Sequence, residues 1–440
     1  MTTETRQLGF WMCTALVVGN MIGMGIFVLP ASLAPFGFNA FLGWGATVLG
    51  CAILALVFAT LSRRMPGADG PFGYVRETLG EGVAFAAMWC YWIAIWVANA
   101  ALAVGAAGYL TGVAPQLAVA PPAVLAAGLV WLFVIINWFG ARTGGRVQVL
   151  TAALKLVPLA LVILLGAWML VADPVAYTEH IPTQPITLSS TMAASTIALF
   201  AMLGLESATV PAGRVKNPEF TIPRATLVGT LLTAAVYIAV TAVSTLLVPQ
   251  ETLAASNAPF VDVLDRLLGA GNGRWLALFV VISGLGCLNG WTLVVGELTR
   301  TLASRRLLPA VFANSNRFGA PGPALLLTGL LATGVALMNY SKTLVEGFTF
   351  LSIVVTAANL PIYLSCSLGL LWLWRRSPGN VPRHAWLFGI GGTAFSIFAF
   401  IGVGAEPFLW ALGLALAGLP VYFLMRWLHP PQAVAASPPT

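Results

Sequence analysis

The sequence predicts an all-α polytopic membrane protein with twelve transmembrane helices. Of its 440 residues, 59% are hydrophobic and only 8% are charged, whereas soluble domains carry roughly 25% charged residues. The mean hydropathy is +0.91. One bilayer crossing needs ~20 apolar residues, and the chain supplies about a dozen such stretches separated by short loops. This composition excludes a disordered chain and a cytosolic enzyme.

The apolar segments are expected to cross the membrane in order along the chain. The 172–189 connection contains acidic residues and no Lys or Arg. The 249–273 connection contains six apolar residues at helical spacing, which predicts a short amphipathic helix on the outer surface. Those six are Phe260, Val261, Val263, Leu264, Leu267 and Leu268. The predicted spans are 9–33, 40–62, 82–112, 122–140, 147–171, 190–212, 224–248, 274–303, 322–340, 347–374, 384–403 and 406–428.

The basic residues orient these spans. Seventeen of the 21 Lys and Arg residues fall on the side of the N-terminus, and only three fall in the opposite loops. By the positive-inside rule, both termini are cytoplasmic. The net charge of +7 therefore reflects topology, and no nucleic-acid partner is needed to explain it. The seventeen are Arg6, Arg63, Arg64, Arg76, Arg142, Arg146, Arg214, Lys216, Arg224, Arg300, Arg305, Arg306, Arg317, Arg375, Arg376, Arg383 and Arg426.

Two spans contain residues that disfavour a continuous helix. The first contains GNMIGMG, with Gly19, Gly23 and Gly25, and each Gly costs ~1 kcal/mol relative to Ala in a helix interior. The sixth contains MLGLESA, with Gly204 in its middle. Broken helices in the first and sixth spans are typical of an inverted repeat of five plus five spans. Close helix packing through small residues is the alternative explanation for Gly19-xxx-Gly23.

The five cysteines lie inside apolar stretches without metal-ligand spacing. They are expected to act as small buried hydrophobes, with no disulfide framework and no metal site. They are Cys13, Cys51, Cys90, Cys287 and Cys366.

Three segments resemble the amino acid–polyamine–organocation superfamily of transporters, and within it the arginine/agmatine exchangers. They are GNMIGMGIFVLPASLA at 19–34, GLESATVPAGRVKNPEFTIPRAT at 204–226 and GCLNGWTLVVGE at 286–297. The resemblance runs from about Leu8 to the last span. It implies one transporter domain over 1–428, with repeats at about 9–171 and 190–374, two extra helices at 384–428, and a disordered cytoplasmic tail at 429–440.

The resemblance also implies alternating access in the plasma (inner) membrane without nucleotide hydrolysis. The sequence contains no GxxxxGK[ST] phosphate loop, which agrees with this expectation. No cofactor and no enzymatic activity are expected. The expected partners are the lipid bilayer and a small amino acid or amine. The resemblance is also compatible with proton coupling and with a homodimer.

Two ionisable residues lie deep in predicted spans. Glu206 costs at least ~3 kcal/mol at mid-span, and the matching residue of the arginine/agmatine branch belongs to a gate near the site; a structural link between broken-helix N–H groups is the alternative. Lys155, in span five, stands where sodium-dependent relatives bind sodium. A structural brace and a proton switch both remain open for it, because desolvation lowers the pKa of a buried Lys.

The resemblance places further substrate residues on spans one, three, six and eight. Trp291 matches a Trp that packs on the arginine side chain, and an aromatic face attracts a cation. Tyr91, Ile95 and Asn99 share one face of span three, although Asn99 could instead link helices. The other substrate-binding candidates are Asn20, Ile22, Gly23, Met24, Gly25, Phe200 and Leu203.

Two positions depart from the arginine/agmatine pattern. Phe200 replaces a gating Trp, which keeps an aromatic lid but loses its N–H. Met24 replaces a Ser that helps to hold the substrate carboxylate, although backbone N–H groups around Gly23–Gly25 can still bind a carboxylate.

The sequence therefore predicts an exchanger of a cationic amino acid such as arginine. A proton-coupled permease for neutral amino acids is the alternative, motivated by Lys155 and by the two departures. A membrane-embedded protease is disfavoured because the three His residues lie in loops or at span ends, and a sensor is disfavoured because no soluble output domain is present.

Overall fold

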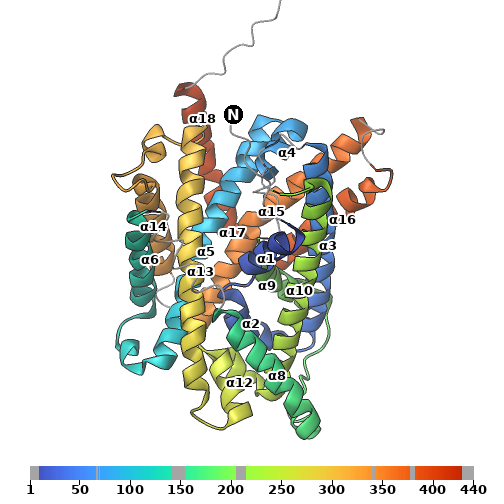
Figure 1. The fold of residues 1–440 in the computed structure, drawn as a ribbon, viewed down its shortest axis with the longest axis vertical. Coiled ribbons are helices and arrows are strands. Elements are labelled where there is room, and N and C mark those ends of the chain that lie inside the picture. The colour runs from blue at the N-terminus through green and yellow to red at the C-terminus, as the bar shows by residue number, and fades with distance from the viewer. Residues whose placement is uncertain are drawn as a thin grey trace, which may run out of the picture.

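The computed structural model describes residues 9–65, 68, 70–140, 154–204, 215–338, 342–376 and 382–428. These residues form a bundle of α-helices (Figure 1). The helices are α1 (Phe10–Met21), α2 (Gly25–Leu33), α3 (Asn39–Arg64), α4 (Gly70–Leu79), α5 (Glu81–Val113), α6 (Pro122–Trp138), α8 (Leu156–Ala172), α9 (Leu188–Met202), α10 (Pro218–Leu247), α11 (Gln250–Ala255), α12 (Pro259–Leu268), α13 (Gly273–Ser304), α14 (Gly322–Met338), α15 (Leu344–Arg376), α16 (Ala385–Gly402), α17 (Ala405–Leu416) and α18 (Gly418–Leu428).

Seven helical segments in the described ranges are long and apolar enough to cross a membrane. They are α3, α5, α10, α13, α15, α16, and α17 together with α18. Six shorter apolar helices accompany them: α1, α2 with its 3-10 extension, α6, α8, α9 and α14. The all-helical prediction is therefore confirmed, whereas the count of twelve spans stays a prediction.

The first predicted span is broken, as the glycines indicated. Helix α1 ends at Met21 and α2 begins at Gly25. Ile22 between them is extended, with φ −70° and ψ 100°. The sixth predicted span also stops early, because α9 ends at Met202 rather than continuing to 212. Residues 205–214, which complete that span and its following loop, lie outside the described residues.

The helix contacts have the reciprocal pattern of an inverted repeat. Helix α1 packs against α10, and α9 packs against α3. In an inverted repeat the first span corresponds to the sixth and the second to the seventh. Under that correspondence α1 maps onto α9 and α10 maps onto α3, so the first contact maps onto the second. The pairs α3 with α10, α5 with α13, and α6 with α14 are also in contact, and each of these pairs maps onto itself.

The amphipathic helix predicted in the 249–273 connection is α12, at one end of the bundle (Figure 1). Its apolar face packs into the protein. The ring of Phe260 lies 5.0 Å from that of Phe27 in α2. The hydroxyl of Tyr109 donates to the Phe27 carbonyl oxygen at 2.6 Å and accepts from the Phe260 N–H at 3.1 Å. Helix α12 is thereby fixed onto α2 and α5. Its buried apolar residues are Phe260, Val263, Leu264 and Leu267.

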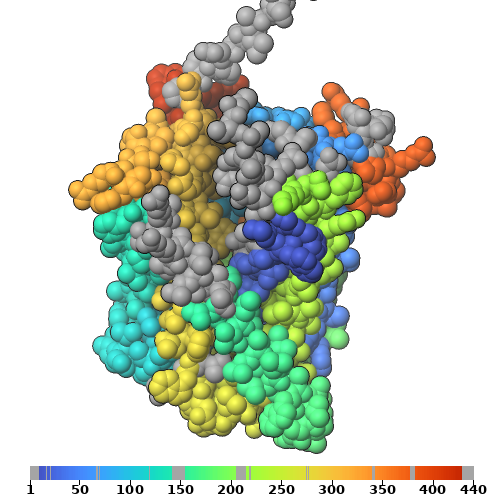
Figure 2. Space-filling model, viewed as in Figure 1, coloured from blue at the N-terminus to red at the C-terminus, as the bar shows by residue number. Residues whose placement is uncertain are grey.

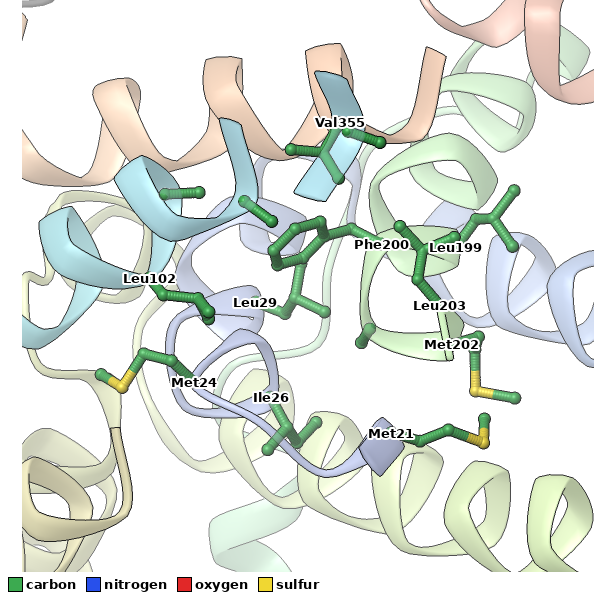
Figure 3. Packing of buried hydrophobic residues seen from close by; sticks show 14 of the residues in the cluster. Met21, Met24, Ile26, Leu29, Leu102, Leu199, Phe200, Met202, Leu203 and Val355 are labelled. Atoms are coloured by element: carbon green, nitrogen blue, oxygen red, sulfur yellow. The ribbon is translucent and has the colours of Figure 1, made fainter. Parts of the chain in front are cut away.

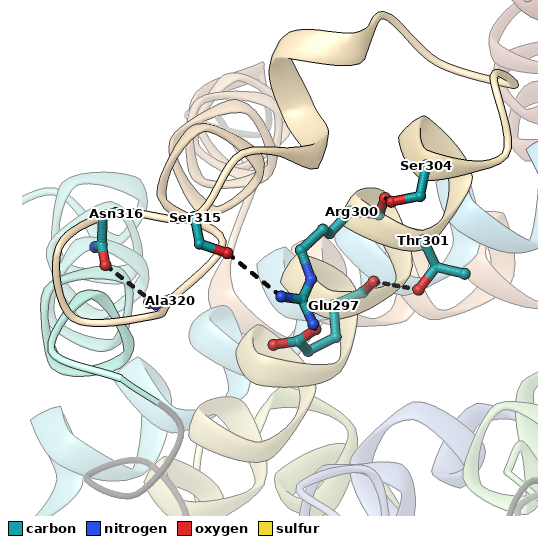
Figure 4. Close-up of polar contacts among 7 residues, drawn as sticks. All are labelled: Glu297, Arg300, Thr301, Ser304, Ser315, Asn316 and Ala320. Atoms are coloured by element: carbon teal, nitrogen blue, oxygen red, sulfur yellow. Dashed lines mark hydrogen bonds and ion pairs between the residues drawn. The ribbon is translucent and has the colours of Figure 1, made fainter. Parts of the chain in front are cut away.

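Polar contacts connect the C-terminal end of α13 to the following loop (Figure 4). The guanidinium of Arg300 lies 2.6 Å from the carboxylate of Glu297, one turn earlier on the same helix. It also donates to the hydroxyl of Ser315 at 3.4 Å. The end of α13 is thus tied to the loop that leads into α14.

Helix α1 lies at the surface of the bundle. It runs across the view in Figure 1, whereas α13 runs nearly along the long axis, and in the space-filling view it is exposed beside α10 (Figure 2). Trp11 is 73% exposed and Met12 is 54% exposed. In contrast, all nine residues of α2 are buried. The two halves of the broken span therefore have different surroundings.

Candidate functional site

A cavity lies beside the break between α1 and α2. We call it the central cavity. Its wall is mostly apolar and comes from five places in the chain: the break, α5, the end of α9, α13 and α15. The lining residues are Met21, Gly23, Gly25, Tyr91, Ala94, Ile95, Ala98, Leu102, Phe200, Ala201, Leu203, Gly204, Cys287, Trp291, Val355 and Asn359.

Seven of the residues proposed from the sequence line this cavity. They come from predicted spans one, three, six and eight, so the structure brings together positions far apart in the chain. They are Gly23, Gly25, Tyr91, Ile95, Phe200, Leu203 and Trp291.

Other proposed residues lie elsewhere. The side chain of Met24 is fully buried and packs into the gap left by Gly284 of α13 and Gly105 of α5, so it is no part of the cavity wall. Ile22 is buried and Asn99 is 3% exposed, and neither lines the cavity. The side chain of Asn20 and the whole of Glu206 lie outside the described residues.

Three side chains, those of Lys155, Tyr237 and Cys287, form hydrogen bonds with backbone groups that lack a helical partner at the break. The ammonium of Lys155 donates to the carbonyl oxygens of Gly19 and Ile22, the latter at 2.9 Å. Tyr237 donates to the Met21 carbonyl oxygen at 2.7 Å and accepts from the next free N–H, that of Gly23. A backbone interruption inside a membrane needs such partners, because each unsatisfied group costs several kcal/mol.

Cys287 of α13 completes this set. Its sulfur accepts from the backbone N–H of Met24 and from the side chain of Trp291, one turn along the same helix. A Cβ at Gly23 would lie 2.8 Å from the same sulfur. The backbone of the break thus lies directly against α13. A residue larger than Gly at position 23 would prevent this close approach.

The indole of Trp291 is held on the cavity wall. Its contact to Cys287 fixes one edge of the ring. Two residues before Trp291, the amide oxygen of Asn289 accepts from the amide nitrogen of Asn137 in α6 at 3.0 Å. Both Asn side chains are fully buried. Packing of α13 against α6 therefore sets the position from which Trp291 faces the cavity.

Two helix ends meet at the cavity. Helix α9 ends with Leu203 extended and Gly204 at φ +97°, a left-handed conformation that favours glycine. The last carbonyl groups of α9 then face the cavity region and carry the negative end of the helix dipole. Helix α2 begins at Gly25 and presents the positive end. The arrangement can bind an ammonium and a carboxylate at the same time.

Phe200 lines the central cavity, and Figure 3 shows it among labelled hydrophobic residues of α2, α5, α9 and α15. Its ring is perpendicular to that of Phe348 in α15, with centroids 5.6 Å apart. A Cβ at Gly25 would lie 3.2 Å from the Phe200 ring. Phe200 is therefore packed between the start of α2 and α15, and its role as an aromatic lid stays a prediction.

The sequence reasoning missed two polar lining residues. Cys287 was assigned to core packing, but it lies one turn before Trp291 and therefore shares its face of α13. Asn359 is an amide near the middle of span ten, two residues before Pro361. A polar residue at that depth was the signal that identified Glu206 and Lys155, and it applied equally to Asn359. Within the described ranges, no three His, Cys, Asp or Glu side chains lie together as a metal site.

Comparison with known proteins decides the family. The family model described as amino acid permease matches residues 8–411. The chain belongs to the amino acid permease family. Members of this family and the similar proteins below are membrane transporters, so the protein is a transporter and not an enzyme.

Similar proteins match along the whole chain. The cadaverine/lysine antiporter of Escherichia coli strain K12 is 30% identical over 443 residues, covering 98% of this chain and 97% of its own. A putative arginine/ornithine antiporter of Bacillus subtilis strain 168 is 30% identical, covering 95% and 97%. A putrescine transporter of Escherichia coli strain K12 is 27% identical, covering 96% and 97%.

A solved structure shows the same fold at low sequence identity. The chain matches a Na⁺-coupled sialic acid symporter in a substrate-bound, outward-open state with a TM-score of 0.53 and 11% identity, over 91% of each chain. The predicted fold class, a helical membrane transporter with a broken first helix, is thereby confirmed. Alternating access is consistent with this fold.

Proposed function

We propose that this amino acid permease exchanges a cationic amino acid for a related amino acid or amine. The similar proteins are named as exchangers or transporters of lysine, cadaverine, arginine, ornithine and putrescine. The single observation that carries the proposal is the position of Trp291 on the wall of the central cavity. An indole face attracts ammonium and guanidinium groups by ~2 kcal/mol or more when they are desolvated.

In this proposal the substrate's backbone groups bind at the two helix ends. Its carboxylate accepts from the first N–H groups of α2, which begins at Gly25, and its α-amino group donates to carbonyl oxygens around Leu203. Its side chain extends along Tyr91 and Ile95 toward Trp291. Glu206 as part of a gate remains a prediction, as do proton coupling and a homodimer.

Alternating access would move the two halves of the broken span separately. The half that contains α2 is packed tightly: besides the Tyr109 contacts, the hydroxyls of Ser32 and Thr349 lie 2.6 Å apart. The half that contains α1 is exposed on one face.

Competition in counterflow tests the proposal. Proteoliposomes loaded with unlabelled arginine take up labelled arginine, and external lysine, ornithine or cadaverine competes with that uptake, whereas alanine and serine do not. Absence of arginine and lysine counterflow between pH 5 and 7 would contradict the cationic assignment.

A second candidate is a proton-coupled permease for neutral amino acids. Lys155 favours it, because a buried ammonium at the break supplies a proton-carrying group. The apolar wall of the central cavity also favours it, since no Asp or Glu occurs among the described lining residues. Competition by alanine, serine or methionine, together with no competition by arginine, would select this candidate.

A further inference from the structure

Asn359 is a polar side chain set in an otherwise apolar part of the cavity wall. It lies on α15 one turn after Val355, and both residues line the central cavity. The side chain is 4% exposed, and its amide oxygen has no hydrogen-bond partner among the described residues. An amide group buried without a partner costs ~1–3 kcal/mol. A donor that reached this oxygen from the cavity would remove that cost.

A neighbouring hydroxyl on α15 behaves differently. Thr356 donates to the carbonyl oxygens of Ser352 at 2.9 Å and Thr196 at 3.3 Å. Ser352 itself donates to the Thr349 carbonyl oxygen at 2.7 Å. These groups are satisfied by the protein, as most buried polar groups are. Unpaired polar groups are thus not a general feature of α15, and the Asn359 oxygen differs from these hydroxyls.

The packing of α15 places Asn359 at the level of the substrate's side chain. Phe348 of α15 packs at Gly105 of α5. Further along α15, Asn359 lines the same cavity as Tyr91 and Ile95, which lie earlier on α5. Residue numbers therefore rise along α15 as they fall along α5, so the two helices are antiparallel here.

The surroundings of Asn359 leave room for a ligand. Ala94 and Ala98 of α5 also line the cavity, and their short side chains do not fill the space in front of α15. The two helix ends that suit the substrate's carboxylate and α-amino group lie at Gly25 and Leu203 instead. In the proposed function those two ends hold the substrate's carboxylate and α-amino group, which leaves Asn359 to the substrate's side chain.

We propose that Asn359 is a specificity-determining residue whose amide oxygen accepts a hydrogen bond from the distal ammonium or guanidinium of the substrate. The inference rests on the proposed function and extends it. Trp291 provides a cation-attracting face, but it cannot distinguish an N–H donor from a methylated cation by hydrogen bonding. Asn359 supplies a directional acceptor without a second buried charge, so the empty cavity holds no unpaired carboxylate among its described walls.

Paired substrates test the inference. Lysine and norleucine have the same carbon skeleton, and only lysine carries a distal ammonium. Binding and counterflow of both are measured on the full-length protein and on three variants: Asn359→Leu, Asn359→Asp and, as a control on the same helix away from the cavity, Ser352→Ala. Elution as a single peak in size-exclusion chromatography establishes that each variant is folded.

The inference predicts a selective change. Asn359→Leu raises the half-saturation concentration of lysine by about tenfold or more and leaves that of norleucine unchanged, because a hydrogen bond to a charged group is lost. Asn359→Asp lowers the value for lysine relative to norleucine, which keeps the test decisive if the Leu variant does not fold. Ser352→Ala has no effect on either.

Three other results have different meanings. Wild-type protein that prefers lysine over norleucine, with the same preference in Asn359→Leu, overturns this inference and leaves the proposed function standing. An equal loss for both substrates also overturns it, since that is the effect of a structural residue. Wild-type protein that prefers norleucine contradicts the proposed function itself.

Discussion

The ammonium of Lys155 lies 2.9 Å from the carbonyl oxygen of Ile22, at the point where the first span leaves its helix. It also donates to the carbonyl oxygen of Gly19. A cation at the C-terminal end of a helix is stabilised by the helix dipole, and here it also replaces backbone hydrogen bonds. Lys155 is therefore a structural part of the break beside the central cavity, even though it does not line that cavity.

Replacement of Lys155 by Met tests this role. The variant keeps the length of the side chain but leaves two carbonyl oxygens without their donor. We expect a loss of about 2 kcal/mol or more in stability, since hydrogen bonds from a charged donor are worth ~1.5–3 kcal/mol each. Transport should fall at least about tenfold. Thermal melting in detergent and counterflow in proteoliposomes measure the two effects; unchanged values for both would contradict the role of Lys155 at the break.

Trp291 is expected to determine affinity for the cationic side chain. Trp291→Ala should raise the half-saturation concentration for arginine by about tenfold or more, because a desolvated cation–π contact is worth ~2 kcal/mol. Trp291→Phe should lose less, because it keeps an aromatic face. The measurement is arginine counterflow as a function of concentration. Equal, wild-type values for both variants would show that the substrate binds elsewhere.

The close approach of Gly23 to Cys287 predicts a rescue. Gly23→Ala places a methyl group 2.8 Å from the Cys287 sulfur, and overpacking of this kind costs ~1–3 kcal/mol, so transport should fall by roughly tenfold. Cys287→Ala in the same chain removes the sulfur and should restore part of the activity, because it relieves the overpacking but also removes the contacts of this sulfur to Met24 and Trp291. Counterflow by the two single variants and the double variant forms the test. A double variant as inactive as Gly23→Ala would mean that the methyl group itself obstructs the substrate.

Asp262 on α12 predicts a pH-dependent stability effect. Burial raises the pKa of this carboxyl above its ordinary value, despite the hydrogen bond that Ser256 donates to it. The folded state then binds the proton more tightly than the unfolded state, so this group stabilises at low pH and loses that contribution as the pH rises through its folded pKa. Asp262→Asn should therefore melt at a higher temperature than wild type at pH 7.

The advantage of Asp262→Asn should shrink as the pH falls toward the ordinary Asp value of about 4, where wild-type Asp262 is protonated as well. Asp265→Asn on the same helix is the matched comparison. The carboxylate of Asp265 accepts from the Gly273 N–H at 2.6 Å, so that variant should not gain stability. A pH-independent difference between wild type and Asp262→Asn would contradict the burial effect.

The features predicted correctly from the sequence depend on local chemistry. The break in the first span follows from Gly23 and Gly25, because glycine weakens a helix wherever it lies. Helix α12 follows from apolar spacing alone. The count of twelve spans cannot be checked by helix length, because broken and short helices such as α9 and α14 fall below the length of a full crossing.

The direction in which side chains point could not be predicted. Met24 aligns with a substrate-contacting position in the resembling family, yet its long side chain fills the space left by Gly105 and Gly284 on two other helices. Asn99 and Asn359 are both mid-span amides with an unpaired oxygen, but only Asn359 lines the central cavity. The rotation of each helix about its axis decides such cases, and it depends on long-range packing.

Exchange itself is tested most directly by trans-stimulation. Uptake of labelled arginine is measured into proteoliposomes that contain unlabelled lysine or arginine and into matched proteoliposomes that contain only buffer, at the same pH on both sides. We expect rapid uptake into the loaded vesicles and little into the empty ones, because an exchanger returns only with substrate bound. Equal uptake into both, or uptake that appears only with an imposed proton gradient, would contradict exchange of a cationic amino acid.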